Sequence, residues 1–358
     1  MIDFLVIGGG IAGLSTAARL APFGRTLVLE AEGALAYHAT GRSAAMFEQN
    51  YGQASTIALN RASAAFHRSF QGGVLSDRGL MLVASRAENE AFVQDLITMD
   101  LAEISAEEAR LLIPVLDPDV LHRAAYHADA FDIDTHKLTE GFAREIRAHN
   151  GQIVTNARVQ RAKHGPAGWQ VLAGDVPYQA KLLINAAGAW ADEVAATAGV
   201  ARIGLQPYRR SMARIAAPAG HDVSGWPMVF GAAESWYAKP DAGALLVSPA
   251  EEDPVQPFDA WADDMVLAEG LARYEAMVTT PVERLLANWA GLRSFAPDRN
   301  LVIGFDPAQP AFFWVAGQGG YGIQSSPAAS QFAADLILGR QSELDGPTRA
   351  QLDPARFS

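Results

Sequence analysis

The sequence predicts an α/β (α+β two-domain) protein, in which the second domain is inserted into the first in two segments. Three observations lead to this prediction. Over residues 3–30 an apolar segment, a glycine-rich turn, an alanine-rich stretch and a second apolar segment follow one another. A second glycine-rich loop, residues 316–324, precedes another helix-forming stretch near the C-terminus. Residues 205–286 lack this glycine signature and alternate strand-like pieces with turns rich in Pro and Asp.

The composition is that of an ordinary globular protein, and it excludes several classes of function. The 358 residues are 49% apolar and 19% charged, and their formal net charge is −12. Because nucleic-acid binding depends on clustered Lys and Arg, this acidic balance predicts no nucleic-acid partner. The chain has no Cys. Disulfides, zinc–thiolate sites, iron–sulfur clusters, thiol nucleophiles and a flavin tethered through cysteine are therefore excluded.

The apolar segments also bear on where the protein resides. None is long enough for a transmembrane helix, so the sequence predicts no membrane span. The first apolar strand begins at Ile2, which leaves no basic region for a secretory signal. We therefore expect a cytoplasmic protein, with peripheral attachment to the inner membrane as the alternative.

The N-terminal segment has the pattern of a dinucleotide-binding unit. Residues 3–7 form a predicted strand, and the helix that follows opens at the pattern Gly8-x-Gly10-x-x-Gly13. Such glycines let the backbone approach a pyrophosphate, whose charge then lies at the helix N-terminus. Glu30 ends the second strand, where an acid accepts hydrogen bonds from an adenosine ribose. This unit is typical of a Rossmann-like domain, but it does not distinguish FAD from NAD.

The middle of the chain predicts helices and a short meander of strands. Ser105 and Glu108 have the spacing of a capping box, so Glu108 is expected to cap a helix rather than to act in catalysis. Asp132, Asp134 and His136 are metal-binding residue types, but a helix N-cap and a solvated face explain them better, and we predict no metal site. Helices are expected at residues 134–150 and 328–338, and strands at 153–155, 169–172, 181–185 and 312–315.

Three further segments favour the longer cofactor, FAD. Residues 37–45 follow soon after Glu30, and their small side chains would let the backbone lie along an isoalloxazine ring. Residues 182–190 form an apolar strand that ends in small residues, which permits close approach to a dinucleotide. The loop at 316–324 leads into a helix whose N-terminus places partial positive charge where a reduced flavin is anionic. We therefore expect FAD, bound without a covalent bond.

At these segments the sequence resembles the D-amino acid oxidase family of FAD-dependent oxidoreductases, which includes glycine and sarcosine oxidases. The likeness covers the whole chain and is greatest to the bacterial D-arginine dehydrogenases. It rests on residues 6–8, 40–45, 131–135, 185–190, 237–243, 289–295 and 319–324. The resemblance implies two domains, with an amino acid held between a substrate-domain sheet and the flavin. The FAD-binding domain would comprise residues 1–75, 140–203 and 288–358, and the antiparallel-sheet substrate domain residues 76–139 and 204–287.

The resemblance also implies which residues contact the cofactor. Gly320 and Gln324 match the family's contacts to the substrate amine and to the flavin, respectively. The full set of expected cofactor contacts is Gly8, Gly10, Ile11, Ala12, Gly13, Glu30, Ala31, Thr40, Gly41, Arg42, Ser43, Ala44, Ala45, Met46, Val159, Ala187, Gly188, Gly291, Gly319, Gly320, Tyr321, Gly322, Ile323 and Gln324.

An amino acid substrate needs a cation for its carboxylate, and the planar fork of an arginine suits this role. Arg293 lies in an apolar, small-residue context and is one candidate, with a structural ion pair as the alternative. The resemblance selects Arg210 as the second, although the sequence alone does not separate it from Arg209. Tyr51 and Tyr237 match family tyrosines that bind the carboxylate, but either can instead be a core aromatic residue.

Two positions depart from the D-arginine dehydrogenases. Met46 stands where those enzymes have an active-site histidine beside the flavin, and Leu80 where they have a glutamate for the substrate guanidinium. A cationic side chain would then lack its partner, unless Glu48 or an acid of the inserted domain supplies one. We therefore predict a preference for neutral, apolar substrates.

The expected reaction is the oxidative deamination of a D-amino acid. With the carboxylate held and the α-hydrogen aimed at flavin N5, a neutral amine helps to expel hydride, which gives an imino acid and reduced FAD. Water then hydrolyses the imino acid to a 2-oxo acid and ammonium. Oxygen and a quinone are both open as the final acceptor, and the choice of the D-enantiomer comes from the resemblance.

Three alternatives to this reaction stay open. A secondary-amine oxidase for sarcosine or proline-like substrates would use the same carboxylate clamp. A nicotinamide-dependent dehydrogenase is disfavoured, because it would not need the second glycine loop. A non-catalytic flavin-binding sensor would hold FAD without being reduced by a substrate.

Overall fold

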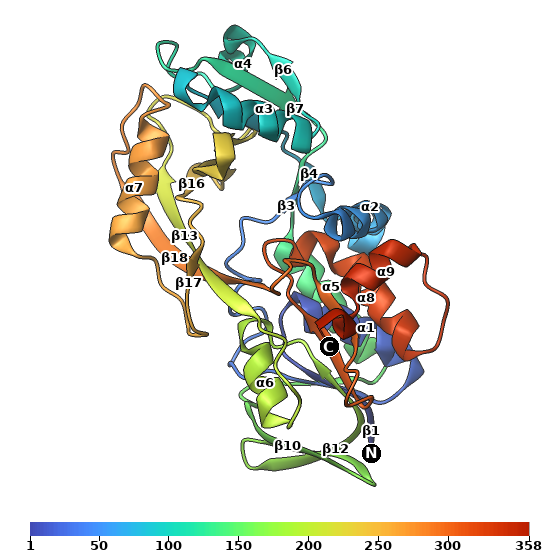
Figure 1. Ribbon diagram of the computed structural model, residues 1–358. Coiled ribbons are helices and arrows are strands. Elements are labelled where there is room, and N and C mark those ends of the chain that lie inside the picture. Colours follow the sequence, from blue (N-terminus) through green and yellow to red (C-terminus); the bar gives the residue numbers. More distant parts are fainter. Residues whose placement is uncertain (358) are drawn as a thin grey trace.

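The chain folds around two large β-sheets, and the computed structural model describes residues 1–357. Figure 1 shows both termini in the half that contains the eight-stranded sheet, whereas the nine-stranded sheet forms the other half. The chain crosses between the halves several times, so each half is assembled from separate segments of sequence. This mixed α/β architecture agrees with the fold class predicted from the sequence.

The eight-stranded sheet has a parallel centre. Its strands are β1 (Ile2–Ile7), β2 (Thr26–Leu29), β9 (Gln152–Val154), β10 (Val159–Gly165), β11 (Gly168–Ala173), β12 (Val176–Asn185), β19 (Val302–Phe305) and β20 (Phe312–Ala316). β1 lies between β2 and β12 and runs parallel to both, while β10, β11 and β12 form an antiparallel meander. Because β1, β2 and β12 end at the same edge, that edge is where an open parallel sheet binds its ligand.

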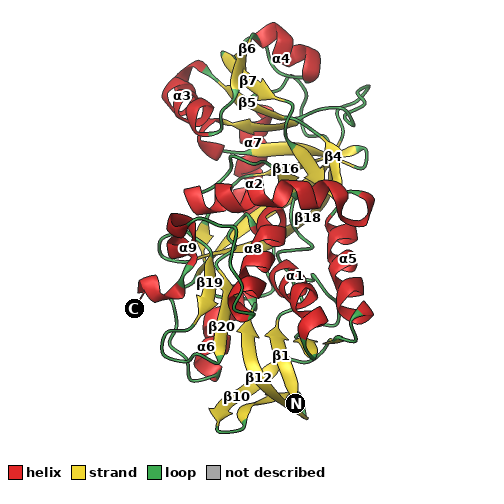
Figure 2. Ribbon diagram, turned by 90° about the vertical axis from the view of Figure 1, so that its right-hand side faces the viewer, coloured by secondary structure: helices red, strands yellow, loops and turns green. Residues whose placement is uncertain are grey.

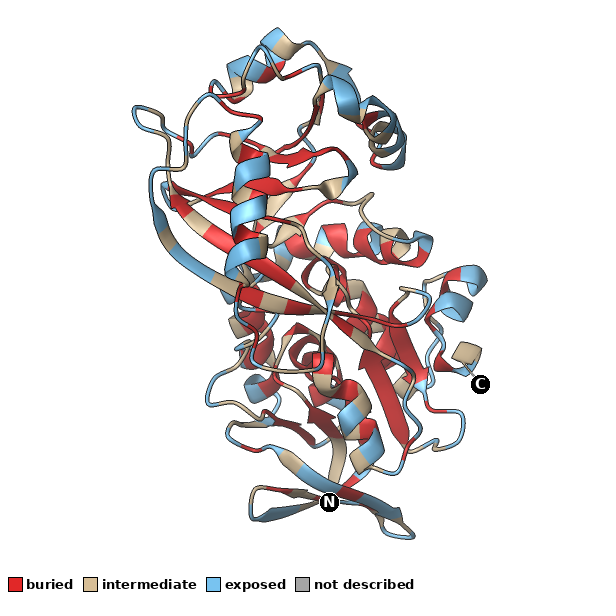
Figure 3. Cartoon of the chain, turned by 60° about the vertical axis from the view of Figure 1, so that its left-hand side comes forward, coloured by how far each residue is buried: buried red, intermediate tan, exposed pale blue. Residues whose placement is uncertain are grey.

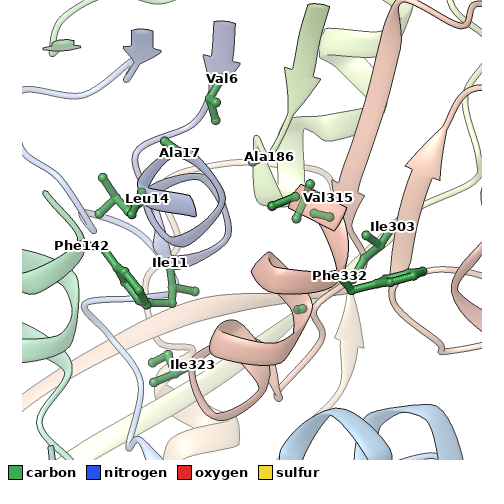
Figure 4. Close-up of a cluster of buried hydrophobic side chains, with 14 of the residues drawn as sticks. Val6, Ile11, Leu14, Ala17, Phe142, Ala186, Ile303, Val315, Ile323 and Phe332 are labelled. Atoms are coloured by element: carbon green, nitrogen blue, oxygen red, sulfur yellow. The ribbon is translucent and has the colours of Figure 1, made fainter. Parts of the chain in front are cut away.

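Alternating side chains give this sheet two buried faces. Val6, Val28 and Ile184 point to one face, whereas Leu5 and Leu27 point to the other. The first face packs on helices α1 (Ile11–Leu20), α2 (Ala54–Ser69), α5 (Thr135–Ala148), α8 (Gly322–Ile337) and α9 (Gly346–Leu352). α6 (Ala191–Thr197) and the meander cover the second. Figure 4 shows part of this core, with labelled side chains from β1, α1, α5, β19, β20 and α8.

The nine-stranded sheet is antiparallel except for one pair. Its strands are β5 (Leu80–Ala84), β6 (Ala102–Ile104), β7 (Arg123–His127), β13 (Gln206–Ala216), β14 (Met228–Gly231), β15 (Tyr237–Asp241), β16 (Ala244–Ser248), β17 (Asp253–Pro254) and β18 (Leu285–Phe295). β5 and β14 are the parallel pair. The long strands β13 and β18 pair over most of their length and extend toward the other half.

The two faces of this second sheet have different neighbours. One face packs on α4 (Ala106–Leu112) and α7 (Asp264–Glu275), and Figure 3 shows that the outer side of α7 is exposed. The other face turns toward the first half, and α3 (Asn89–Thr98) covers only part of it. That face consists mainly of the apolar side chains Leu80, Leu82, Met212, Phe230, Tyr237 and Leu246.

A small third sheet joins the two halves. It consists of β3 (Met46–Phe47), β4 (Leu75–Asp77) and β8 (Phe131–Ile133), with β8 in the middle. In Figure 2, helix α2 crosses the molecule at the same level. The segment after the N-terminal glycine loop is therefore fixed where the two large sheets approach each other.

Several details of the local structure differ from the sequence predictions. The C-terminal helix begins at Gly322 rather than at residue 328, with Pro327 inside it. The carbonyl oxygen of Ile323, which Pro327 leaves without its helical N–H, accepts instead from the Ser326 hydroxyl at 2.9 Å. The domain boundary predicted at residue 288 falls inside β18, which pairs with β13 in the nine-stranded sheet. We therefore propose a boundary near residue 296. The capping box of Ser105 and Glu108 and the N-cap at Asp134 are confirmed.

Within residues 1–357, no helix combines the length and the apolar character that crossing a bilayer requires.

Candidate active site

A cavity of about 360 Å³ lies between the two large sheets. It extends from the ends of β1 and β2 to the apolar face of β13, β15 and β18. Most of the expected site residues line it. They are Gly8, Gly10, Ile11, Ala12, Glu30, Ala31, Thr40, Arg42, Ser43, Ala44, Val159, Ala187, Gly188, Arg210, Tyr237, Gly291, Arg293, Gly319, Gly320, Gly322 and Ile323.

At one end of the cavity the backbone forms a cradle at the start of α1. Gly8 has φ +112°, and a Cβ there would lie 2.3 Å from the carbonyl oxygen of Ala186. A Cβ on Gly13 would lie 1.9 Å from the Gly8 oxygen, so only glycine lets α1 start so close to β1. Gly10, the N-cap residue, provides no side-chain cap. The N-terminus of α1 therefore remains suited to a phosphate group.

Glu30 shapes the same end of the cavity. Its carboxylate accepts hydrogen bonds from the backbone N–H of Gly9 at 2.6 Å and of Glu32 at 2.8 Å. Thr40 contributes from the following loop, where its hydroxyl oxygen accepts from the N–H of Ile11 at 3.1 Å. These bonds hold an acid and a glycine loop side by side, as the ribose and pyrophosphate of a dinucleotide require.

Two glycines show that the middle of the cavity fits a long cofactor. A Cβ on Gly188 would meet no atom within 4 Å, and one on Gly291 would meet none closer than 3.7 Å. Both residues line the cavity, so a side chain at either position would project into the space itself. This unfilled space, continuous with the cradle at Gly8, agrees with the extended shape of FAD.

Arg42 connects the two halves of the molecule beside this space. Its guanidinium donates to the carbonyl oxygens of Ala260 at 2.9 Å and Ala290 at 3.1 Å, and it pairs with the Asp259 carboxylate at 2.5 Å. Ala260 also lines the cavity. A segment of the inserted half thus closes over the cofactor cavity and is held there by a residue of the 37–45 loop.

At the opposite end the cavity is lined by charged and aromatic side chains of the nine-stranded sheet. Arg210 on β13 lies opposite Gly291 of β18, and Arg293 of β18 lies opposite Tyr208, so the register brings the two arginines to one region. Gly320 lies directly against Arg293, because a Cβ there would be 2.9 Å from the guanidinium carbon. Tyr237, on β15, lines the same part of the cavity.

Both guanidinium groups have hydrogen-bonding capacity to spare. Arg210 is only 7% exposed, its Nη2 is 3.5 Å from the Glu252 carboxylate, and its Nε and Nη1 have no partner among residues 1–357. Nη1 of Arg293 donates to the Tyr51 hydroxyl over a long 3.4 Å. Buried donors without partners, as on Arg210, are costly, and Arg293 adds a second guanidinium with one long hydrogen bond, so the pair is suited to an anion.

The surrounding groups keep Arg293 charged. Burial opposes the charged guanidinium, but the nearby Tyr51 and Tyr237 oxygens and the Glu234 carboxylate outweigh it and raise the pKa of Arg293. Burial, together with Glu234, raises the pKa of Tyr51, so that hydroxyl stays protonated. The site therefore offers a permanent cation and a neutral hydroxyl side by side.

Glu234 is a residue of this site that the sequence did not identify. Its carboxylate accepts a hydrogen bond from the Tyr51 hydroxyl at 3.1 Å. Glu234 and the preceding Ala233 have φ of +50° and +57°, a conformation that non-glycine residues adopt rarely and often near functional sites. No sequence signal predicts two successive left-handed residues without glycine. Only the general expectation of an acid from the inserted domain points toward Glu234.

Glu251 is a second acid near the arginines that the sequence did not identify. Its carboxylate accepts from the backbone N–H of Ser211 at 2.5 Å, next to Arg210. Burial raises its pKa, although the hydrogen bonds with Ser211 and the charge of Arg210 oppose the rise. The adjacent pair of acids at 251 and 252 is visible in the sequence, but nothing there connects it with β13.

Seven expected site residues do not line the cavity. Gly13 and Gly41 instead allow close backbone contacts, since a Cβ on Gly41 would be 2.4 Å from the Ala36 oxygen. The side-chain oxygen of Gln324 accepts from the backbone N–H of Glu48 at 2.9 Å. The others lie just behind the lining: Ala45, Met46, Tyr51 and Tyr321, with the two tyrosine rings packed edge to face 5.1 Å apart.

The positions that bear on specificity are mainly apolar. Met46 packs against the cluster of Leu80, Met212 and Tyr237 on the nine-stranded sheet. Leu80 itself is buried in that cluster and does not line the cavity. The Glu48 carboxylate is also buried, and it pairs with Nε2 of His127 at 2.8 Å. Glu48 is thus already engaged, which leaves Glu234, Glu251 and Glu252 as the acids near the arginines.

The metal-binding residue types of the 132–136 segment have other partners. The Asp132 carboxylate pairs with Arg78 and Lys239 at 2.7 Å each, and Asp134 caps α5. Residues 1–357 contain no cluster of three or more His, Asp or Glu that could hold a metal ion.

Comparisons with known proteins agree with this geometry. The model of the DAO family, described as FAD dependent oxidoreductase, matches residues 3–336. The bovine (Bos taurus) FAD-dependent oxidoreductase domain-containing protein 1 is 23% identical, with 94% of this chain and 81% of that protein covered. Glycine oxidase from Bacillus licheniformis is 24% identical, with 94% and 93% covered. The crystal structure of L-proline dehydrogenase from P. horikoshii has a TM-score of 0.85 at 21% identity, with 99% and 97% covered.

Proposed function

We propose a substrate class for this protein. The chain belongs to the DAO family of FAD-dependent oxidoreductases, whose model covers most of its length. The protein is therefore an FAD-dependent oxidoreductase. We infer that it oxidises the Cα–N bond of an amino acid with a neutral, apolar side chain, as the D-enantiomer. The single observation that carries this proposal is the pair of arginines at the end of the FAD cavity: Arg210, whose buried Nε and Nη1 have no partner among residues 1–357, and Arg293, which makes one long hydrogen bond to Tyr51.

The residues would hold FAD along the whole cavity. The N-terminus of α1 and Gly8 would receive the pyrophosphate, and Glu30 the adenosine ribose. The isoalloxazine ring would then lie at the far end, near Ala44 and Tyr237. Bound there, FAD supplies the acceptor for a hydride from the substrate carbon.

The chain itself binds and orients the substrate. Arg210 and Arg293 would hold the carboxylate, with a hydrogen bond from Tyr237. Tyr51, which donates its hydroxyl proton to Glu234, would position Arg293 from behind the cavity wall. The carbonyl oxygen of Gly320 would accept from the amine. Two fixed contacts, at the carboxylate and at the amine, determine the direction of the α-hydrogen. Water would then convert the released imino acid to a 2-oxo acid and ammonium, without a protein nucleophile.

The walls of the cavity support an apolar side chain. Met212 and Leu292 line it and are almost fully buried, and Met46 packs behind them. The acids near the two arginines are already engaged: Glu234 with Tyr51, Glu251 with Ser211 and Glu252 with Arg299. A guanidinium would therefore lose its hydration without gaining a free carboxylate. In this respect the chain would differ from the D-arginine dehydrogenases that its sequence resembles.

A secondary-amine substrate is the second candidate. The fold likeness to L-proline dehydrogenase favours it, because proline is a secondary amine that carries the same carboxylate. The glycine oxidase relative extends the range to small amino acids. The carboxylate clamp would be the same for all these substrates, so a direct comparison of substrates is needed.

The test is anaerobic mixing of the purified holoenzyme with single substrates while the visible absorbance of the flavin is recorded. We expect D-Leu, D-Met and D-Phe to bleach the flavin about a hundredfold more efficiently than D-Arg and D-Lys, which corresponds to about 2.7 kcal/mol. Faster bleaching by L-Pro or sarcosine would establish the secondary-amine alternative. FAD that no substrate bleaches would indicate a flavin-binding sensor.

Glu234 provides a matched variant for the specificity claim. If the wild type prefers D-Arg, and Glu234→Gln loses that preference, Glu234 is the substrate's counter-charge and the apolar-pocket proposal is wrong. Glu103→Gln is the control, since Glu103 pairs with Arg123 on the exposed surface of the same sheet.

A further inference from the structure

Lys239 is a buried cation that the carboxylate clamp does not use. It lies on β15 two residues after Tyr237, so both side chains project from the same face of the sheet. It is only 7% exposed. Its Nζ donates to the carbonyl oxygen of Ala44 at 2.5 Å and to the Asp132 carboxylate at 2.7 Å. Lys239 therefore connects the inserted sheet to a loop of the other half.

That loop forms part of the wall of the FAD cavity. Ser43 and Ala44 line the cavity, and Ala45 has φ +49°. Because a non-glycine residue adopts this conformation at a cost, the surrounding contacts must hold it. Lys239 holds the carbonyl just before Ala45, and the pairing of Met46 with β8 holds the residue just after it.

Asp132 is shared between two cations. Arg78 donates to it from Nε at 2.8 Å and approaches it with Nη2 at 2.7 Å, while Lys239 binds its other oxygen. The side chains of Arg78, Asp132 and Lys239 are 13%, 19% and 9% exposed. The cluster therefore carries one net positive charge in surroundings with little water, beside the loop that contacts the cofactor. An unbalanced buried cation is stabilised by an anion nearby.

We propose that Lys239 is a positioning residue for the flavin: it fixes the Ala44 segment of the cavity wall, and the positive Arg78–Asp132–Lys239 cluster favours reduced over oxidised FAD. Reduction adds negative charge to the isoalloxazine ring, and only the reduced form provides an anion for this cluster. The inference depends on the proposed placement of the ring near Ala44 and Tyr237, but on no particular substrate.

The test is the midpoint potential of the flavin in holoenzyme variants, measured with a chemical reductant and a reference dye. Lys239→Met removes the cation, so we expect the equilibrium for reduction to fall about tenfold, which is about 30 mV for a two-electron couple. Asp132→Asn removes the anion and should shift the potential upward. Lys181→Met is the control, because Lys181 forms an exposed pair with Asp3, also at 2.7 Å, and should leave the potential unchanged.

The flavin potential should fall in Lys239→Met and rise in Asp132→Asn, and these opposite shifts distinguish an electrostatic effect from structural damage. Equal potentials in all four proteins, or shifts of Lys239→Met and Asp132→Asn in the same direction, would overturn the proposal. If Lys239→Met does not retain FAD, the upward shift in Asp132→Asn still decides the question. A holoenzyme with the expected potentials that no amino acid reduces would contradict the proposed function and leave this inference standing.

Discussion

At the end of the cavity formed by β1, β2 and α1, the lining consists mainly of glycines, the N-terminus of α1 and the acid Glu30, whereas at the end formed by β13, β15 and β18 it includes Arg210, Arg293 and Tyr237. The first end depends on close backbone contacts that only glycine allows, as at Gly8. The second depends on Arg210, which has buried donors without a partner among residues 1–357, and on Arg293, which makes one long hydrogen bond to Tyr51. A change at the first end should therefore affect cofactor retention, and a change at the second should affect substrate selection.

The largest effect is expected from Gly8→Ala at the backbone end. Alanine is strained at the φ of +112°, and its Cβ would lie only 2.3 Å from the Ala186 oxygen. We expect the substitution to destabilise the cradle by roughly 3 kcal/mol or more. The variant should be purified with little FAD, as measured by flavin content after denaturation. Gly165→Ala is the matched control, because a Cβ there meets no atom within 4 Å and its φ is not positive. Full FAD content in Gly8→Ala would show that the cradle is placed wrongly.

Loss of either arginine should show most clearly that the two ends of the cavity have different roles, because substrate turnover should fall while FAD stays bound. Arg293→Ala and Arg210→Ala should each lower kcat/KM for the best substrate, by roughly 2 to 5 kcal/mol of transition-state stabilisation, and leave FAD bound. Arg214→Ala serves as the control, since Arg214 is on the same strand but pairs with Asp241. Near-normal kinetics for Arg293→Ala would mean that the carboxylate binds elsewhere.

Gly320→Ala should have an intermediate effect on substrate binding, because Gly320 lies where the second glycine-rich loop contacts Arg293. The added Cβ would lie 2.9 Å from the Arg293 guanidinium, which would have to move, at roughly 1 to 3 kcal/mol. We expect a higher KM with FAD content unchanged. Release of FAD instead would assign Gly320 to the cofactor rather than to the positioning of Arg293.

The smallest effect concerns the joint between the halves, where Glu48 pairs with His127. Burial opposes the charged imidazole, but the hydrogen bond and charge of Glu48 outweigh it, and the pKa of His127 lies above its usual value. A raised histidine pKa stabilises the fold fully below the unfolded value of about 6.5, and this stabilisation is lost as the pH rises through the folded pKa. The difference in unfolding free energy between wild type and Glu48→Gln should therefore shrink from about pH 6.5 upward.

His67 provides a contrast within the same molecule. Burial lowers the pKa of His67 to about 4, despite its hydrogen bond to the Gln324 carbonyl oxygen at 2.8 Å. Its contribution has the opposite sign, because stability is complete above about pH 6.5 and falls as the pH drops toward 4. Glu48→Gln should leave this acid-side slope unchanged. A difference between wild type and Glu48→Gln that grows above pH 6.5 would contradict the account of His127.

The same comparison explains how far the sequence could predict the structure. The backbone end is encoded in contiguous motifs, so Gly8, Gly10, Glu30 and Thr40 were all expected where the cavity has them. The side-chain end is assembled by strand register across distant segments, and no local pattern contains that information.

Arg209 and Arg210 show the limit directly. On β13 successive side chains point to opposite faces, and only the register shows that Arg210 lines the cavity while Arg209 pairs with Asp253. Glu234 was missed because its left-handed backbone is not specified by a glycine. Leu80 was expected to contact the substrate, but on its strand it faces the apolar cluster behind the cavity wall.

The most direct test of the central claim is an anaerobic titration of the holoenzyme with 4-methyl-2-oxopentanoate, the 2-oxo acid corresponding to leucine, followed by the flavin absorbance spectrum. The account predicts a saturable spectral change in the wild type and in Arg214→Ala. In Arg293→Ala the affinity should be at least about thirtyfold weaker, or about 2 kcal/mol. Equal affinity in Arg293→Ala and the wild type, or no change in the flavin spectrum, would contradict a carboxylate clamp at the flavin end of the cavity.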